Sequence, residues 1–420
     1  MYCKLCFLNL LLVFFSSTYI QAQNKFTSND SLLIYLMKQH PIQFDSLLSN
    51  PSQYRIQILY TQINRDKNNI PHFKEFSYRL NSNEYFYPAS TVKFPLSVLA
   101  LEKLNNLNIV GLTKSTTAVY DSITARQETV YNNPYAIDGR QTIEQAIKEV
   151  LVVSDNNAAN RLYEFLGQEY IHSQLASKGY PDVYIRNRLE LGRTPMENRQ
   201  TQAVQFYDSN NKIIYSQLAQ NNTSKLPYYN VFIGNGYLNN NDSLINEPLN
   251  FSEKNRISLS DLHHIMQSVI FPTQTPKQQR FNLSSEDRKF LLQWMHTTPD
   301  KSVYPSYDSS EYYPAYAKFL MLGSERGLIP NKIKIFSKAG DAYGFLLDIA
   351  YIMDIEAKVE FMLSAVIYVN ADGILNDNNY DYKTIGLPFM KNLGNTLYQY
   401  ELNRNRDYHP NFDDILNPLQ

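Results

Sequence analysis

The chain has 420 residues, of which 43% are hydrophobic and 19% are charged, so it can bury the core of a packed globular protein. Its 39 basic and 40 acidic residues leave a formal net charge of -1. This balance argues against a nucleic acid or an anionic membrane as partner. We therefore expect a small-molecule substrate, no nucleic acid and no stable membrane insertion.

Residues 1–22 have the features of a secretory signal peptide. Lys4 precedes an apolar run at residues 5–15, and small or polar residues follow. The run is too short to span a membrane comfortably. Cys3 and Cys6, the two cysteines of the chain, both lie in this segment, so the mature protein has neither disulfides nor a cysteine nucleophile. We expect a secreted or periplasmic protein with a single domain at residues 23–420.

The predicted elements follow the order helix, hairpin, helices, three strands, helix. Residues 28–40 begin with capping residues and then space their apolar side chains as a helix does. Residues 54–63 and 73–80 alternate as strands on either side of a polar turn, which predicts a hairpin. Further helical patterns cover residues 91–159, 258–271, 284–298 and 382–402, and β-rich runs cover residues 331–340, 343–355 and 357–370.

Strands from both ends of the chain must share one antiparallel sheet, because a hairpin alone is barely stable. The predicted fold class is therefore α/β (α+β), with one antiparallel sheet and helices before, between and after its strands. Residues 200–255 are polar, rich in Asn and Tyr, and carry several turn signals. We interpret them as a small β insertion in the helical region, of no predicted role.

The segment YPASTVKFPLSVLALEKL, residues 87–104, places a Ser and a Lys three residues apart at the start of an apolar helix. One helical turn puts Ser90 and Lys93 on the same face, where the amine can accept the serine proton if its pKa is depressed. The positive end of the helix would stabilise developing negative charge. This spacing alone is a weak signal, because Ser209 and Lys212 match it too, and Ser90 taken alone is better explained as a helix N-cap.

Two later segments strengthen the chemical interpretation. The triplet Ser-Asp-Asn at residues 154–156 follows an apolar run and precedes a helix. It is either an N-cap with Asx-turn geometry or a site in which Ser154 relays a proton and Asn156 donates a hydrogen bond to a substrate amide. Lys338 ends a predicted strand and is followed by Ala339 and Gly340. Three weak signals in this order together indicate a catalytic site.

The three segments resemble the Ser-x-x-Lys, Ser-Asp-Asn and Lys-Thr-Gly elements of serine β-lactamases and penicillin-binding proteins. The neighbouring stretches YPASTVKFP, SDNNAANRL and LLQWM are similar to those of class A β-lactamases. The resemblance covers residues 54–402 apart from the insertion. It implies a β-lactamase/transpeptidase-like fold with a five-stranded antiparallel sheet flanked by helices and a helical subdomain, in a monomer that uses no cofactor or metal.

The resemblance also implies a role for each matching residue. It makes Ser90 the acylated nucleophile, Lys93 its proton partner, and Ser154 the hydroxyl that passes a proton to the departing nitrogen. Lys338 would hold the substrate carboxylate and polarise Ser154, and Asn156 would bind the substrate amide. The backbone N–H groups of Ser90 and of Asp341, the residue after Gly340, would form the oxyanion hole.

Class A enzymes also require a Glu that activates the deacylating water. Counting onward from Ser154 without gaps places the family's Arg-aromatic-Glu element on Arg188, Leu189 and Glu190. The Asn expected four residues later is replaced by Thr194, and Glu197 followed by Asn198 offers a competing pair. Glu190 is the first candidate for the base and Glu197 the second.

Departures from the family pattern leave the substrate open. Ala339 replaces a hydroxyl residue that would bind a β-lactam carboxylate, no Arg follows before Ile352, and Asp341 adds negative charge. Affinity for penicillins is expected to fall, since a charge-assisted hydrogen bond contributes about 1.5 to 3 kcal/mol. Three interpretations stay open: β-lactam hydrolysis, a peptidase or esterase acting on another amide or ester, and a non-catalytic member of the fold. The histidine spacing does not suit a zinc hydrolase, and no Gly-x-Ser-x-Gly elbow is present.

Overall fold

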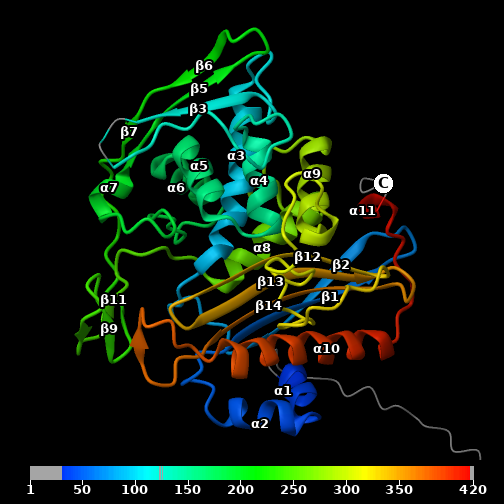
Figure 1. The fold of residues 1–420 in the computed structure, drawn as a ribbon. Helices are drawn as coiled ribbons and strands as arrows, with labels where there is room; N and C mark the ends of the chain where they lie inside the picture. Colours follow the sequence, from blue (N-terminus) through cyan, green and yellow to red (C-terminus); the bar gives the residue numbers. More distant parts are fainter. Residues whose placement is uncertain (1–30, 123, 125, 417–420) are drawn as a thin grey trace, which may run out of the picture.

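The computed structural model describes residues 31–122, 124 and 126–416, so the predicted signal peptide lies outside the described residues. Five long strands form one antiparallel sheet in the order β12-β13-β14-β1-β2 (Figure 1). The N-terminal strand β1 pairs with β14 near the other end of the chain, with Gln57 opposite Val366. The prediction that both ends share one five-stranded antiparallel sheet is confirmed. The strands are β1 Gln57–Arg65, β2 Pro71–Tyr78, β12 Ile333–Ala342, β13 Phe345–Asp354 and β14 Val359–Tyr368.

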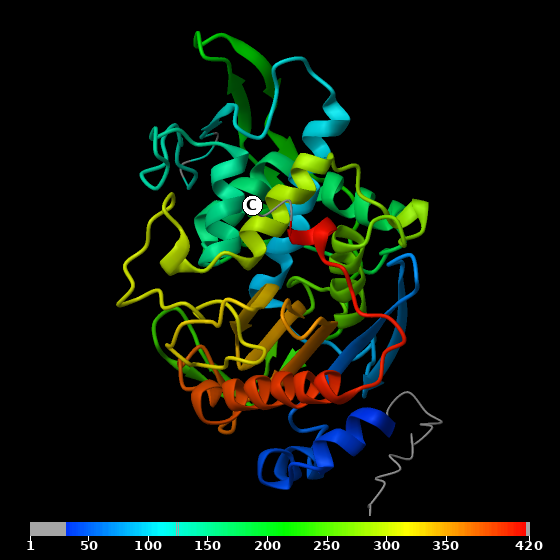
Figure 2. The same cartoon turned by 90° about the vertical axis from the view of Figure 1, so that its right-hand side faces the viewer.

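The sheet is covered on both faces, which explains why its central strands are apolar almost throughout. All ten residues of β13 are buried, as expected for a strand that packs against helices on both sides. Figures 1 and 2 show α1, α2 and α10 along one face of the sheet and the helical part of the molecule on the other. The three helices are α1 Ser31–Lys38, α2 Pro41–Ser49 and α10 Leu387–Asn403. Two hydrophobic cores result, one on each face.

The helical subdomain lies on the other face of the sheet and is built from six helices. They are α3 Lys93–Leu107, α4 Ile143–Val152, α5 Asn156–Leu166, α6 Gln168–Ser177, α8 Leu259–Ile270 and α9 Ser285–His296. Serine caps fix the starts of two of them: Ser258 accepts from Asp261 N, and Ser284 completes a capping box with Asp287. Within the described ranges, no helix is long and apolar enough to cross a membrane.

Two predicted helical segments differ from the structure. The predicted N-terminal helix ends at Lys38, and a second helix, α2, starts at Pro41, because proline suits the first turn of a helix and interrupts an existing one. Residues 108–142 are not helical: Asn108 ends α3 in a left-handed conformation. The β-branched stretch that follows forms strand β3, Thr117–Asp121.

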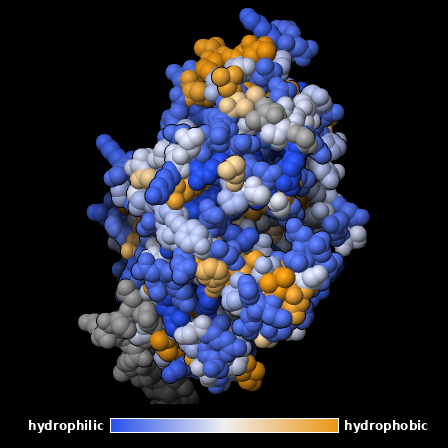
Figure 3. Space-filling model, turned by 90° about the vertical axis from the view of Figure 1, so that its left-hand side faces the viewer, coloured by the Kyte–Doolittle hydropathy of each residue, from blue (hydrophilic) through white to orange (hydrophobic). Residues whose placement is uncertain are grey.

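The 200–255 segment forms short strands that are tied to both parts of the molecule. Strand β3 pairs with β5, which pairs with β6, so this small sheet includes a strand from outside the segment. Strand β9 pairs in parallel with β15, which follows β14. Figure 3 shows a mostly hydrophilic surface on the side of these strands, with apolar side chains gathered at its upper end. The strands of the segment are β4 Gln200–Thr201, β5 Ala203–Tyr207, β6 Ile213–Gln217, β7 Gln220–Asn221, β8 Phe232–Ile233, β9 Gly236–Leu238, β10 Leu244–Ile245 and β11 Leu249–Asn250. Strand β15, outside the segment, is Ile374–Leu375.

Candidate active site

Ser90 lies where the helical subdomain meets the edge strand of the sheet. It belongs to a short 3-10 turn, Ala89–Val92, that leads directly into α3 at Lys93. Strand β12 passes so close to this turn that a Cβ added at Gly340 would lie 2.5 Å from the backbone N of Ser90. Only a glycine permits this approach, which brings the strand backbone beside the Ser90 N–H.

Backbone strain marks the same region. Ala89, directly before Ser90, has φ +45°, and Ser154 has φ +63°, both in the left-handed region that non-glycine residues seldom occupy. Asp155 caps α5 by accepting a hydrogen bond from Ala158 N at 2.7 Å, so the helix start holds Ser154 in this conformation. The N-cap interpretation of the Ser-Asp-Asn triplet therefore applies to Asp155, which leaves the Ser154 side chain free for other partners.

Two buried lysines converge on Ser154. Lys338 Nζ donates to Ser154 Oγ at 2.8 Å and to its neighbour's carbonyl, Ala339 O, at 2.7 Å. Lys93 Nζ lies 3.1 Å from the same Oγ and also donates to Ser154 O. Lys93 and Lys338 are 61 and 184 positions away from Ser154 in the sequence, yet both amines contact its hydroxyl.

The Ser90 hydroxyl is not joined to the Lys93 amine, in contrast to the contact expected from their spacing. Within the described chain, Ser90 Oγ makes no hydrogen bond, while the Lys93 amine is directed to Ser154. The Lys93 amine is held instead by two oxygens of Ser154, its backbone carbonyl and its hydroxyl. The hydroxyl of Ser90 faces the pocket without an internal partner.

Burial controls the charge of both lysines. Removal from water lowers the pKa of Lys93 to about 7, although the carboxylates of Asp155, Glu190 and Asp341 oppose the shift. Burial and the nearby Lys93 place the pKa of Lys338 well below its ordinary value. A substantial fraction of Lys93 is therefore neutral near pH 7 and able to take a proton. Perturbed pKa values of this kind cluster at functional sites.

A pocket of about 390 Å³ opens at Ser90. Four of the predicted site residues line it together: Ser90, Asn156, Glu190 and Asp341. Lys93 and Lys338 do not line it and lie behind it, in contact with Ser154. Residues that the sequence did not single out complete the wall, chiefly Tyr87, Tyr343, Tyr380, Tyr382, Asn376 and Asn378.

Tyr87 directly precedes the turn that carries Ser90, and the other residues come from the connection after β14 and from the β12–β13 turn. Tyr87 and Tyr343 meet edge to face, with ring centroids 5.0 Å apart, and the Tyr382 hydroxyl accepts a hydrogen bond from Gly344 N at 2.8 Å. The only signal for them in the sequence was the high tyrosine content, which indicates an aromatic cleft without identifying its members.

The structure separates the two candidate glutamates. Glu190 lines the Ser90 pocket, and the residue before it is held on both sides by Asn160, whose side chain accepts from Leu189 N at 2.9 Å and donates to Leu189 O at 3.0 Å. Arg188 is anchored by a buried ion pair with Glu164 at 2.6 Å. The backbone on the N-terminal side of Glu190 is therefore fixed.

Glu197 is occupied elsewhere. Its carboxylate closes the capping box of α7, Pro195–Arg199, with Thr194, and it pairs with Arg126 at 2.6 Å. The backbone N–H of Thr194 lowers the pKa of this carboxyl. Glu197 is not among the residues that line the Ser90 pocket. Geometry thus favours Glu190 as the carboxylate that can act on a group bound at Ser90.

The mouth of the pocket carries negative charge. Glu190 and Asp341 are both exposed side chains on its wall, and the described lining residues include no Arg or Lys. Partial burial and Glu190 raise the pKa of Asp341, while Lys338 and Lys93 oppose the rise. Across the described residues, no three His, Cys, Asp or Glu side chains are grouped as metal ligands. The site has the parts for acyl transfer by a serine.

The chain is similar to known proteins in sequence and in fold. The model of the β-lactamase enzyme family matches residues 44–400. No curated protein sequence matches the chain. Among solved structures, a β-lactamase from Xanthomonas campestris pv. campestris is 13% identical, with 89% of this chain and 99% of that chain covered and a TM-score of 0.49. An ancestral class A β-lactamase is also 13% identical, with 89% and 100% covered and a TM-score of 0.46. A β-lactamase from Chitinophaga pinensis is 10% identical, with 86% and 99% covered and a TM-score of 0.47.

Proposed function

Because the chain belongs to the β-lactamase enzyme family, we propose that it is a serine hydrolase that opens an amide or ester bond through an acyl-enzyme at Ser90. The observation that carries the proposal is the convergence of Lys93 and Lys338 on the Ser154 hydroxyl, next to the pocket that contains Ser90. Buried amines with lowered pKa values have little structural benefit there, since burying a charge is costly. They do suit proton transfer.

Acylation begins when Ser90 Oγ attacks the substrate carbonyl carbon and its proton passes to the neutral amine of Lys93. The carbonyl oxygen becomes an oxyanion between the N–H groups of Ser90 and Asp341. Gly340 lets strand β12 pass close to the backbone of Ser90, and this close contact supports the arrangement. The carbon–nitrogen or carbon–oxygen bond then breaks, and the leaving atom takes a proton from Ser154, which regains one from the lysines.

Deacylation requires a water molecule and a base. Glu190 takes a proton from the water, the hydroxide equivalent attacks the acyl carbonyl, the bond from that carbon to Ser90 Oγ breaks, and the proton held by Glu190 returns to Ser90 Oγ. The support for this role is that Glu190 lines the pocket beside Ser90 and that Asn160 fixes the backbone of the preceding residue. General-base catalysis of this kind contributes about 10²- to 10⁴-fold in rate.

The first substrate class to test is the β-lactams, whose amide is activated by ring strain and matches the family assignment. A second class, other amides and esters, is favoured by the charge of the pocket mouth. Glu190 and Asp341 repel the carboxylate that β-lactams carry, and no lining Arg or Lys offsets them among the described residues. We propose β-lactam hydrolysis as the first activity, with uncharged or cationic amides and esters as the alternative.

The test is an intact-mass time course of the mature protein mixed with a penicillin, with Ser90→Ala as the matched control. An adduct that depends on Ser90, appears and then decays as hydrolysed drug accumulates supports β-lactam hydrolysis. An adduct that persists supports acyl transfer with slow deacylation, as in a penicillin-binding protein. No adduct with a penicillin, followed by a Ser90-dependent adduct with a neutral activated ester, supports the second substrate class. Absence of any Ser90 adduct overturns the proposal.

A further inference from the structure

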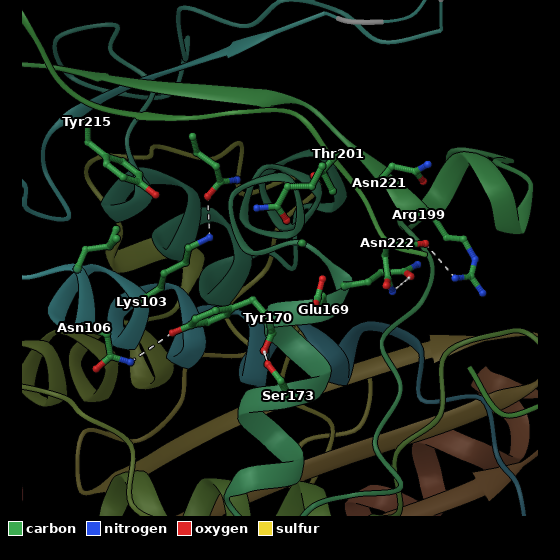
Figure 4. A pocket seen from close by; sticks show the side chains of 15 residues that line it. Lys103, Asn106, Glu169, Tyr170, Ser173, Arg199, Thr201, Tyr215, Asn221 and Asn222 are labelled. Carbon is green, nitrogen blue, oxygen red and sulfur yellow. Dashed lines mark hydrogen bonds between the residues drawn. The ribbon is translucent and has the colours of Figure 1, made fainter. Parts of the chain in front are cut away.

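A second cavity, of about 750 Å³, lies in the helical subdomain against the strands of the insertion (Figure 4). Its wall takes residues from the end of α3, the start of α6, and strands β4, β6 and β7. None of the residues that line it lines the Ser90 pocket. Lys103 on its wall is ten residues beyond Lys93 on α3, which corresponds to about 15 Å along the helix axis. The cavity is therefore distinct from the candidate active site.

Lys103 is a buried amine on the cavity wall with no counter-charge. Its Nζ donates to Phe165 O at 2.5 Å and to Gln217 Oε1 at 2.7 Å, both neutral acceptors. The ring of Tyr170 lies 5.0 Å from the amine. Burial lowers the pKa of Lys103 to about 7, and no charged group in the described chain offsets this shift. Lys178, by contrast, lies 2.7 Å from the carboxylate of Glu102.

Other groups on the wall add positive potential and hydrogen-bonding capacity. Arg199 donates to the backbone oxygens of Asn222 and Ser224 at 3.0 and 2.7 Å, and the first turn of α6 brings the positive end of a helix to the cavity. Thr201 is fully buried, and its hydroxyl has no hydrogen-bond partner in the described part of the chain. The amides of Gln220 and Asn221 are exposed on strand β7.

The charged and titratable groups on the wall set the sign of the potential. They are Lys103, Arg199, Glu169, Tyr170 and Tyr215. Burial raises the pKa values of both tyrosines, so they are neutral, with Tyr170 at about 12. Glu169 is exposed to solvent, where water screens its charge. The interior of the cavity is therefore cationic when Lys103 is protonated.

We propose that this cavity binds a small anionic sugar, a hexuronate or a hexose phosphate, with its charged group toward Lys103. The anion supplies the counter-charge that Lys103 lacks. Sugar hydroxyls pair with the amides of Gln220 and Asn221, and the apolar face of the ring packs on an aromatic side chain such as Tyr170. The volume is in the range of small-molecule sites.

The test is calorimetric titration of the Ser90→Ala protein with glucuronate, glucose 6-phosphate and, as the neutral control, glucose. We expect at least one anion to bind at least about tenfold more tightly than glucose, with proton uptake near pH 7.5 because the bound anion raises the protonated fraction of Lys103. The relative affinities of the two anions distinguish a carboxylate from a phosphate ligand. Equal binding of glucose, or no binding of either anion at about 10 mM, overturns the proposal.

Two substitutions in the cavity wall and one control outside it test whether the anion binds in this cavity. In the Ser90→Ala background, Lys103→Met should weaken anion binding at least about tenfold and abolish the proton uptake. Lys277→Met, at an exposed lysine outside the cavity, should change neither. Gln220→Ala removes an exposed amide without disturbing the core and should weaken binding several-fold, about 1 kcal/mol for one hydrogen bond. Unchanged binding in both Lys103→Met and Gln220→Ala overturns the assignment.

Discussion

Lys93 and Lys103 occupy the same helix, α3, and both are buried amines whose pKa is lowered to about 7. They differ in their surroundings. Lys93 meets a hydroxyl, Ser154, and three carboxylates act on it. Lys103 meets a backbone carbonyl and a Gln side chain, and no carboxylate acts on it among the described residues. A lowered pKa by itself thus does not identify a catalytic lysine. The nucleophile and the proton acceptors around the amine identify it.

The largest expected effect comes from removing each amine in turn. Lys93→Met should slow acylation of Ser90 by on the order of 10³- to 10⁴-fold, since it removes the proton acceptor. Lys103→Met, the matched change ten residues along the helix, should leave acylation within about twofold. The measurement is the single-turnover rate of adduct formation by mass spectrometry, with thermal unfolding to verify that both variants fold. Equal rates in the two variants would contradict the assigned role of Lys93.

The two candidate glutamates allow the same kind of paired test. Glu190→Gln should slow deacylation by about 10²- to 10³-fold and let the adduct accumulate, because the amide cannot take a proton from water. Glu197→Gln should leave deacylation unchanged, since its carboxylate caps α7 and pairs with the exposed Arg126. The decay of a preformed acyl-enzyme measures both. Faster loss of the adduct in Glu190→Gln than in Glu197→Gln would rule out Glu190 as the base.

The pH dependence of acylation should follow Lys93 and not Lys103. Lys93 acts as a base only when neutral, so below its pKa of about 7 the acylation rate should fall about tenfold for each pH unit and should level off above it. Lys103→Met should show the same profile as the wild type. Acylation rates between about pH 5 and 9 test this expectation. A rate that does not change through pH 7 would mean that Lys93 does not carry the proton.

The smallest expected effect is on stability. The pKa of Lys103 is about 7 in the folded protein, against an ordinary value of 10.5. Between these two pH values the Lys103 amine is protonated in the unfolded chain and neutral in the folded one. The cost of burying Lys103 is therefore fully present below about pH 7 and fades as pH rises toward 10.5. Lys103→Met should raise the free energy of unfolding by on the order of 1 to 3 kcal/mol at pH 6 and by less at pH 9. Urea unfolding at the two pH values measures this difference, and a variant less stable at pH 6 would contradict it.

Much of the fold was predictable because its signals are local. The hairpin and the three C-terminal strands follow from alternation and apolar runs, and the serine caps at Ser258 and Ser284 mark the starts of α8 and α9. Of the two errors, the division of the N-terminal helix at Pro41 has a local cause, whereas the other falls where tertiary pairing overrides local pattern. Strand β3 forms because β5, some 80 residues later, pairs with it, and neither stretch contains that information alone.

The site was predicted in part for the same reason. Ser90, Lys93, Ser154 and Lys338 stand out in short motifs, but their spacing did not reveal that both amines are directed to Ser154. Tyr87 belongs to the Ser90 motif, but Tyr343, Tyr380 and Tyr382 have no motif, and only the packing of the β12–β13 turn and the connection after β14 brings them to Ser90. The choice between Glu190 and Glu197 also required the structure, because both lie in the same polar segment.

The sequence by itself determined the family, the strands and helices of the main sheet, and the residues able to do the chemistry, because these depend on side-chain type and on separations of a few positions. Tertiary structure decided the partners: the approach of Gly340 to Ser90, the meeting of two lysines at one hydroxyl, and the cavity around Lys103. The physical reason is that hydrogen bonds and burial act through space over a few ångströms. Residues far apart in the sequence acquire their charge and their role only when folding brings them together.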